Sequence, residues 1–220
     1  MGVLLLVRHG QASFGADDYD VLSETGWQQA RLLGRWLGER GLQPDLVVRG
    51  SMRRHRETAE AMIEGAGWTS EPRVDADWDE FDHLGVVSAH GESVDGLDRR
   101  EFQLLFERAT ARWTSGESAD YPETYAAFLD RVSRATAAAA TEAGSGRTVV
   151  AVTSGGAIGA VCARLSDPDA DQPALARMWS RFNAVTVNSA VTRVLVGSTG
   201  MRLLTFNEHP HVEGDTLTYR

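Results

Sequence analysis

The chain has 220 residues, of which 42% are hydrophobic and 24% are charged, and its formal net charge is −9. This length and composition suit a globular protein with a substantial core. The negative charge argues against nucleic acid or an anionic membrane surface as the main partner, because both repel an acidic chain. The single cysteine, Cys162, excludes a disulfide framework and favours a cytoplasmic location.

The first predicted element is a buried strand over residues 3–7, a continuous apolar run of strand length. Arg8 ends this run, which is too short to cross a membrane and lacks the layout of a signal peptide. Ser23 is a good N-cap for a helix whose apolar residues recur at helical spacing over 28–40, and Gly41 closes that helix.

The middle of the chain predicts one more strand–helix unit and then a departure from the sheet. A short buried strand is expected over 46–48 and a helix over 52–65. Residues 66–98 carry no clear period and read as an irregular excursion. Two helices follow over about 99–114 and 122–143, the second of them rich in alanine.

The last third of the chain returns to alternating strands and helices. A third buried strand is predicted over 148–152 and a helix over 157–164. Three further short strands are expected towards the C-terminus, the last two joined by a glycine-rich hairpin turn, over 185–187, 191–196 and 201–206.

This alternation predicts a three-layer α/β/α fold with a mainly parallel central sheet. We expect a single domain over 1–220 with a cap-like excursion at about 76–125, since no linker or repeat divides the chain. Ligands in such folds bind at the carboxyl ends of the strands. Unusual residues follow three of those ends, namely Arg8-His9-Gly10, Arg49-Gly50-Ser51 and Ser154-Gly155-Gly156.

The first of these segments predicts a phosphate-binding loop. The planar guanidinium of Arg8 suits bidentate phosphate binding, and Gly10 lets the backbone approach a ligand closely. A neutral imidazole attacks phosphorus when its other nitrogen is held as a donor, so His9 is the candidate nucleophile. The alternative for a histidine here is a satisfied side chain at the edge of the core.

Arg54 is a second candidate for holding an anion. It lies near the start of the predicted helix over 52–65, where the helix N-terminus adds positive potential. The alternative is a solvated basic face, because Arg53 and Arg56 lie beside it and most helical arginines are exposed.

Three segments together resemble the histidine phosphatase superfamily, which includes the phosphoglycerate mutases. They keep the order and spacing of that family and read Leu4-Leu5-Leu6-Val7-Arg8-His9-Gly10-Gln11, Leu22-Ser23-x-x-Gly26-x-x-Gln29-Ala30 and Gly50-Ser51-Met52-Arg53-Arg54-His55-Arg56-Glu57-Thr58-Ala59. The resemblance implies a phosphoglycerate mutase-like fold, a phosphorylated His9, and a phosphoryl group held by Arg8 and Arg54. It also implies that the reaction needs no metal or other cofactor.

The family's proton donor is an acid in the excursion after the second helix, where this chain reads Trp78-Asp79-Glu80-Phe81-Asp82-His83. Glu80 aligns best with the donor of the phosphatase branch, and its apolar neighbours favour a protonated carboxyl group. Asp79, Asp82 and His83 stay open as rivals. The alternative for Glu80 is a surface carboxylate in an acidic loop.

The resemblance breaks at the third strand end. The family has a second histidine there, in a Thr-His-Gly-Gly setting, whereas this chain has Thr153-Ser154-Gly155-Gly156. Ser154 can donate a neutral hydrogen bond to phosphate, with help from the backbone of Gly155 at the helix start. Losing one donor to a transition-state oxyanion costs about 3 kcal/mol. We therefore expect phosphate binding with weakened catalysis.

The sequence favours a phosphomonoester hydrolase that acts on a phosphorylated small molecule. Three alternatives stay open: a phosphate-binding protein of the same fold with little turnover, a phosphoglycerate mutase-type phosphotransferase and, more remotely, a serine hydrolase that uses Ser154. A homodimer is also open.

Additional site candidates are Gln11, His83 and His211. His211 lies in a C-terminal segment that resembles an Asn-x-x-x-His ending of the family. Although His209-Pro210-His211 has an alternation that occasionally binds metal, no acidic cluster lies at ligand spacing, so no metal site is predicted.

Overall fold

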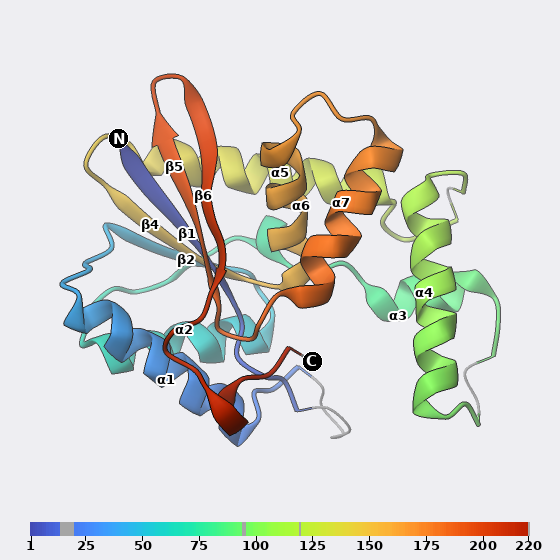
Figure 1. Ribbon diagram of the computed structural model, residues 1–220, viewed down its shortest axis with the longest axis horizontal. Helices are drawn as coiled ribbons and strands as arrows, with labels where there is room; N and C mark the ends of the chain where they lie inside the picture. Colours follow the sequence, from blue (N-terminus) through green and yellow to red (C-terminus); the bar gives the residue numbers. More distant parts are fainter. Residues whose placement is uncertain (14–19, 94–95, 119, 220) are drawn as a thin grey trace.

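The computed structural model describes residues 1–13, 20–93, 96–118 and 120–219. A six-stranded sheet with the order β3-β2-β4-β1-β5-β6 forms its centre (Figure 1). The first four strands along the chain run parallel, while β5 and β6 are antiparallel to their neighbours. The strands are β1 (Gly2–Arg8), β2 (Leu46–Arg49), β3 (Arg73–Val74), β4 (Thr148–Thr153), β5 (Val191–Gly197) and β6 (Gly200–Glu208).

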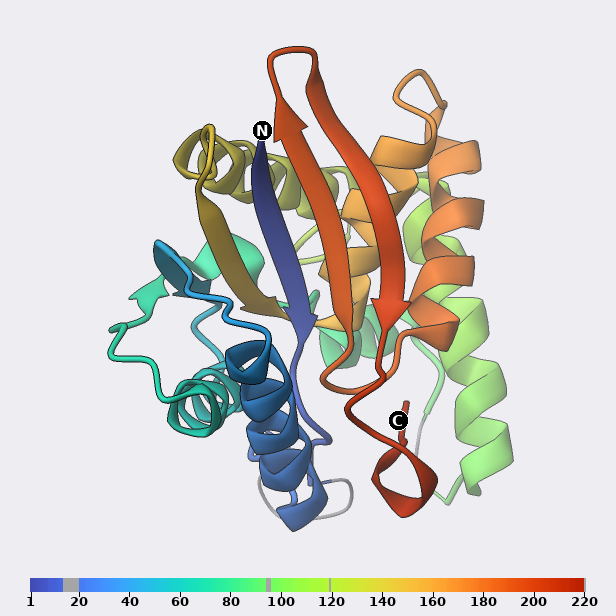
Figure 2. The same ribbon diagram turned by 60° about the vertical axis from the view of Figure 1, so that its left-hand side comes forward.

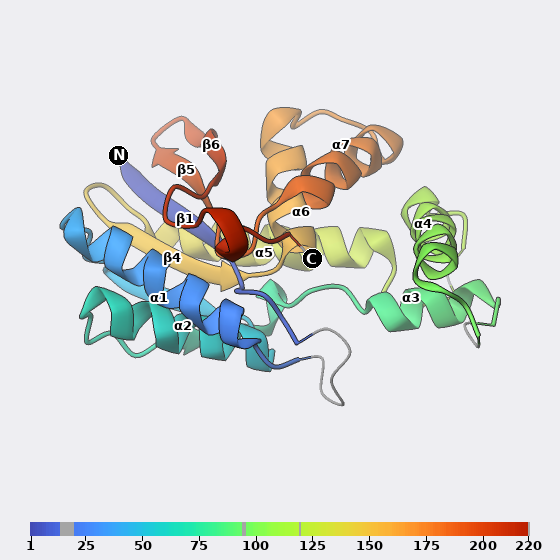
Figure 3. The same cartoon turned by 60° about the horizontal axis from the view of Figure 1, so that its bottom comes forward.

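Helices cover both faces of this sheet (Figure 3). On one face α1 (Glu24–Glu39) packs along α2 (Arg53–Ala66). The other face carries α5 (Tyr125–Glu142) and α6 (Gly155–Ser166), with α7 (Gln172–Val185) alongside α6. The predicted three-layer α/β fold is therefore confirmed. Among the described residues, no helix is both long and apolar enough to cross a membrane.

The apolar run of β1 is continuous because this strand is buried on both faces. Leu4 and Leu6 belong to the core on the α5–α6 side, whereas Leu5 and Val7 belong to the core on the α1–α2 side. Alternate side chains of a strand point to opposite faces, so a central strand covered by helices on both sides needs apolar residues throughout.

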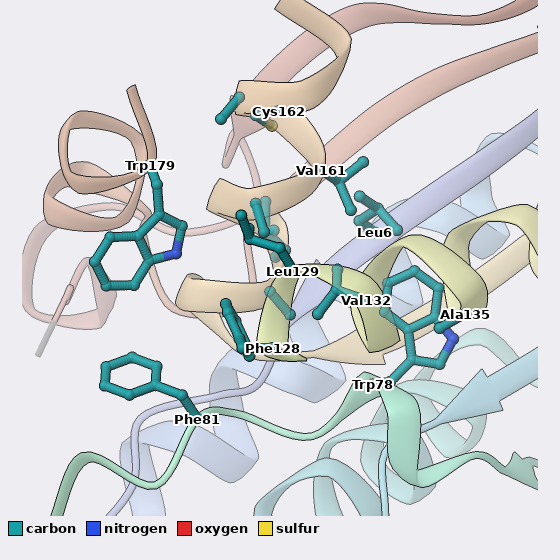
Figure 4. Close-up of a cluster of buried hydrophobic side chains, with 14 of the residues drawn as sticks. Leu6, Trp78, Phe81, Phe128, Leu129, Val132, Ala135, Val161, Cys162 and Trp179 are labelled. Carbon is teal, nitrogen blue, oxygen red and sulfur yellow. The ribbon is translucent and has the colours of Figure 1, made fainter. Parts of the chain in front are cut away.

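The segment that leaves the sheet after β3 contains the short helix η1 (Ala76–Trp78), α3 (His83–His90) and α4 (Arg99–Ser115). Helices α3 and α4 lie beyond the edge of the main body (Figure 1). The segment is anchored by Phe81, whose ring stacks on Trp113 at 4.8 Å between ring centroids. The same ring meets the edges of Phe128 and Trp179 (Figure 4). This aromatic cluster fixes the start of the excursion to the core.

Two local predictions were wrong. Residues 66–98 are not irregular throughout, since they contain β3, η1 and α3. No strand forms over 185–187, because Val185 is the last residue of α7, a helix that the sequence analysis did not predict. Asp171 caps the start of this helix and Pro173 lies in its first turn.

Helices α1 and α2 approach closely at glycines. A β-carbon at Gly34 would lie 2.1 Å from the carbonyl oxygen of Met62. Gly34→Ala should therefore destabilise the protein by about 1–3 kcal/mol, although alanine has the higher helix propensity. The free energy of unfolding, measured in urea, checks this. The exposed Arg35→Ala in the same helix is the control and should change stability by less than about 0.5 kcal/mol. Equal stability of both variants would contradict the close packing.

Candidate active site

The register between β1 and β4 brings two predicted site segments together. Arg8 pairs with Thr153 across these strands, and the backbone N–H of His9 donates to the carbonyl of Thr153 at 2.9 Å. His9 and Ser154 are therefore neighbours at the carboxyl edge of the sheet. A cleft of about 1170 Å³ lies at this edge, and five predicted residues line it: Arg8, His9, Arg54, Glu80 and His83.

His9 is held as a neutral imidazole with one nitrogen fixed as a donor. Its Nδ1 lies 2.7 Å from the carbonyl oxygen of Gly10. Because a carbonyl oxygen can only accept, Nδ1 carries the proton and Nε2 keeps its lone pair. Burial lowers the pKa of His9 well below its ordinary value, and the charges of Arg54 and Arg8 lower it further. The arrangement suits a nucleophile at neutral pH.

Hydrogen bonds to its backbone groups hold the loop around His9 in place. The His9 carbonyl accepts from the backbone N–H of Ser189 and from the side chain of Asn188, each at 3.2 Å. The N–H of Gly10 donates to Thr58 Oγ1 at 3.0 Å. A β-carbon at Gly10 would lie 2.4 Å from the carbonyl oxygen of Gly26. The loop can therefore pack this closely against α1 only because residue 10 is a glycine.

The two arginines reach the site from different elements. The Arg8 guanidinium donates to the carbonyls of Thr186 and Tyr219, the latter at 3.2 Å. The C-terminal segment thus lies beside the carboxyl end of β1 (Figure 2). Arg54, which is only 5% exposed, forms a 2.6 Å ion pair with Asp20. A phosphate that binds Arg54 must therefore compete with the Asp20 carboxylate, a residue that the sequence analysis did not identify.

Glu80 reaches the start of α6 from the excursion. Its carboxylate accepts from the backbone N–H of Gly156 at 3.0 Å and from that of Phe81 at 3.1 Å. A β-carbon at Gly156 would lie 2.2 Å from Glu80 Oε1, so the second glycine of this turn leaves the space that Glu80 occupies.

Arg131 of α5 holds the backbone that carries Glu80. Its guanidinium donates to the carbonyls of Asp77 at 3.1 Å, Asp79 at 2.6 Å and Glu80 at 3.2 Å. The same guanidinium pairs with Glu123 at 2.5 Å. The backbone around Glu80 is thus fixed by the partly buried Arg131 guanidinium as well as by the aromatic cluster around Phe81.

The rivals of Glu80 occupy different surroundings. Asp82 caps α3 by accepting from the N–H of Gly85, and it does not line the cleft. Asp79 accepts from the backbone N–H of Ser51 at 2.6 Å and also from its hydroxyl. Burial raises the pKa of Asp79, but the neighbouring His55 and the hydrogen bonds from Ser51 outweigh this and lower the pKa. Of the four candidates, only Glu80 and His83 line the cleft.

Ser154 lies behind the cleft instead of in its lining. Its side chain is fully buried, and its Oγ lies 2.7 Å from Nε2 of His55, a fully buried residue of α2. The ring centroids of His55 and His9 are 5.8 Å apart. Nothing in the sequence singles out His55, because no period or spacing distinguishes it from the basic residues beside it on the helix.

The backbone of Ser154 argues against the serine-hydrolase alternative. A nucleophile elbow holds its serine in a strained turn that exposes the hydroxyl. Here Ser154 has φ −118° and ψ 168°, an extended conformation, and its side chain is buried. Gly155, which follows it, is the first residue of α6.

Gln11 and His211 lie outside the lining of the cleft. The side-chain oxygen of Gln11 accepts from the hydroxyl of Ser23 at 2.8 Å, near the start of α1. Nε2 of His211 lies 2.8 Å from the hydroxyl of Ser189, and burial lowers the pKa of His211 to about 4. Since the N–H of Ser189 binds the His9 carbonyl, His211 supports the reactive loop from behind.

A family model described as histidine phosphatase superfamily (branch 1) matches residues 4–209. The chain belongs to the histidine phosphatase superfamily. The structure of mycobacterial glucosyl-3-phosphoglycerate phosphatase resembles it with a TM-score of 0.66 and 25% identity, over 94% of this chain and 99% of that one. The fold also matches a phosphoserine phosphatase from Entamoeba histolytica, with a TM-score of 0.70 and 18% identity over 97% and 100% of the two chains.

One curated relative is the 2,3-bisphosphoglycerate-dependent phosphoglycerate mutase of Thermobifida fusca (strain YX). It is 38% identical over 74 residues, and the match spans 30% of this chain and 30% of that protein. The expected phosphoglycerate mutase-like fold is therefore confirmed by the family and by the solved structures.

The lowered pKa of His9 predicts a pH dependence of stability. Below pH 6.5 the His9 imidazole of the unfolded chain binds a proton, whereas that of the folded chain stays neutral. The free energy of unfolding therefore falls as the pH drops through 6.5. His9→Asn keeps a donor towards Gly10 and removes the titration. The variant should lose about 1 kcal/mol less than the wild type between pH 7.5 and 5.5, as measured by urea unfolding. An identical pH dependence in both proteins would contradict a buried, neutral His9.

Proposed function

We propose that the protein hydrolyses a phosphorylated small molecule through a phosphohistidine on His9. The observation that carries this proposal is a neutral His9 whose Nδ1 is fixed by the Gly10 carbonyl, placed between Arg8 and Arg54 in a cleft. Membership of the histidine phosphatase superfamily and likeness to solved phosphatases support it.

In the first step, Nε2 of His9 attacks phosphorus and the bond to the leaving oxygen breaks. Arg8 and Arg54 hold the phosphoryl oxygens and balance their charge. Glu80, protonated for this step, gives its proton to the leaving oxygen.

In the second step, water attacks the phosphohistidine. Glu80, now a carboxylate, takes a proton from that water, and inorganic phosphate leaves as Nε2 regains its lone pair. The N–H groups of Gly156 and Phe81 hold the side chain of Glu80 in place through both steps.

A phosphotransferase of the phosphoglycerate mutase type is the second candidate, because the curated relative from Thermobifida fusca has that name. The two functions differ only in what attacks the phosphohistidine, a water molecule or a second hydroxyl. Release of inorganic phosphate in the absence of any acceptor alcohol separates them.

Substituting His9 and Glu80 tests the proposed roles. His9→Ala should abolish phosphate release from p-nitrophenyl phosphate and from glycerol phosphate. Glu80→Gln should slow glycerol phosphate hydrolysis by about 10²–10⁴-fold. Its effect on p-nitrophenyl phosphate should be far smaller, because nitrophenolate leaves without a proton. Steady-state kinetics on both substrates measure this contrast.

Glu107→Gln is the matched control, since Glu107 lines the same cleft from α4 and takes no part in the proposed mechanism. Equal losses on both substrates in Glu80→Gln would remove Glu80 as the acid. Phosphate binding without turnover on any phosphomonoester would instead favour the phosphate-binding alternative.

The ion pair between Arg54 and Asp20 predicts a gain in anion affinity on substitution. Asp20→Asn removes the charge that competes with phosphate for Arg54. Because Asp20 is partly exposed, the pair is worth up to about 1 kcal/mol, so the inhibition constant of inorganic phosphate should fall by up to about fivefold. Competitive inhibition against p-nitrophenyl phosphate checks this. Weaker phosphate binding in the variant would show that Asp20 orients Arg54 instead of competing with phosphate.

A further inference from the structure

Helix α7 forms one wall of the cleft over most of its length. Pro173 and Ala184, near the two ends of this helix, both line the cleft. A helix rises by about 1.5 Å per residue, so these two residues are about 16 Å apart along its axis. The carbonyl of Thr186, just beyond the C-terminal end, accepts from the Arg8 guanidinium. The cleft therefore continues well past a phosphoryl group that Arg8 would hold.

Two arginines lie on the face of α7 that borders the cleft. Arg177 and Arg181 are one helical turn apart, so their side chains leave the helix on the same side. Both line the cleft and both are exposed. Measured along the helix axis from Thr186, Arg181 is about 8 Å away and Arg177 is about 14 Å away. The two guanidinium groups can thus meet a second part of a substrate whose phosphoryl group is bound at Arg8.

The two guanidinium groups have no acidic partner. Within the residues that the structure describes, neither Arg177 nor Arg181 forms an ion pair or a side-chain hydrogen bond. Glu107 and Glu117 line the same cleft, but the carboxylate of Glu107 accepts from the side chain of Gln103 at 3.0 Å. Four arginines and three glutamates line the cleft, although the net charge of the chain is −9. The positive charge of the lining thus extends beyond the proposed phosphoryl site.

Aromatic rings line the cleft as well. Phe81 and Trp179 belong to the buried aromatic cluster, and both border the cleft. Phe102 and Phe106, which are half-buried on α4, add two more rings. An alcohol that reaches from the phosphoryl site to the arginines would therefore gain from contact with apolar surface.

We propose that the substrate is a phosphomonoester whose alcohol carries a second anionic group, bound by Arg177 and Arg181 at about 8–14 Å from the phosphoryl group. This inference rests on the proposed phosphatase function. Arginine binds the oxygens of a carboxylate or a phosphate through paired N–H groups. Arg177 and Arg181 lie away from the reacting atoms, so they determine specificity and take no part in phosphoryl transfer.

Alkyl phosphates of increasing length test the position of the second anion. The probes are the ω-phosphooxy derivatives of propanoate, hexanoate and nonanoate, each paired with its carboxamide, which has the same shape without the charge. For the two longer chains, kcat/KM should be about fivefold or more higher for the carboxylate, the upper range for an exposed ion pair. The propanoate and its carboxamide should differ by less than about twofold, because the far end of the short chain does not reach the arginines.

Substituting the arginines tests which residues bind the second anion. Arg177→Ala and Arg181→Ala should each raise KM for the carboxylate with the preferred chain length, with little change in kcat, because the lost contact is the same in the ground state and the transition state. Hydrolysis of the matching carboxamide should stay at the wild-type rate. Ser180→Ala is the control, since Ser180 lines the cleft from the same face of α7.

Two results would overturn the second-anion site while the proposed function stands. One is a wild-type protein that hydrolyses p-nitrophenyl phosphate but treats carboxylate and carboxamide alike at every chain length. The other is a preference for carboxylate that persists when Arg177→Ala and Arg181→Ala are combined. A wild-type protein that hydrolyses none of these phosphates would contradict the proposed function, and the second-anion site would fail with it. Thermal unfolding of each variant identifies any that fail to fold.

Discussion

The parallel pairing of β1 with β4 is the constraint on which the rest of the site depends. Its register sets Arg8 opposite Thr153, and one backbone hydrogen bond then joins His9 to the Thr153 carbonyl. His9, the proposed nucleophile, is thereby fixed next to the start of α6, although more than 140 residues separate them along the chain. A shift of one residue would turn the side chains of β1 to the wrong faces of the sheet, so the hydrophobic core enforces this register.

Burial and positive charge act together at His9. Both disfavour a protonated imidazole, and the Gly10 carbonyl then selects which nitrogen keeps the lone pair. The same two arginines that keep His9 neutral are the groups proposed to hold the phosphoryl oxygens. In the proposed reaction, the charges that favour a neutral His9 therefore also attract an anionic substrate, within a chain whose net charge is negative.

The excursion from the sheet places Glu80, the proposed proton donor, at the start of α6. Phe81 packs into an aromatic cluster on one side of Glu80, and Arg131 binds the carbonyls on the other. These anchors are distant in sequence, so the position of Glu80 depends on α5 and on the cluster around it. The same excursion places Asp79 Oδ1 at 3.6 Å from Nδ1 of His55, on the buried side of the cleft.

The sequence by itself determined the layered fold and the family, because apolar periods and short motifs are local, and it predicted that Arg8, His9, Arg54 and Glu80, which line one cleft, would lie together. It did not predict α7, or the helix within residues 66–98, where weak local signals are stabilised by packing. Only the tertiary structure showed that Ser154 faces His55 and that Asp20 pairs with Arg54. These contacts join residues 99 and 34 positions apart, and burial decides which of several similar polar side chains meet.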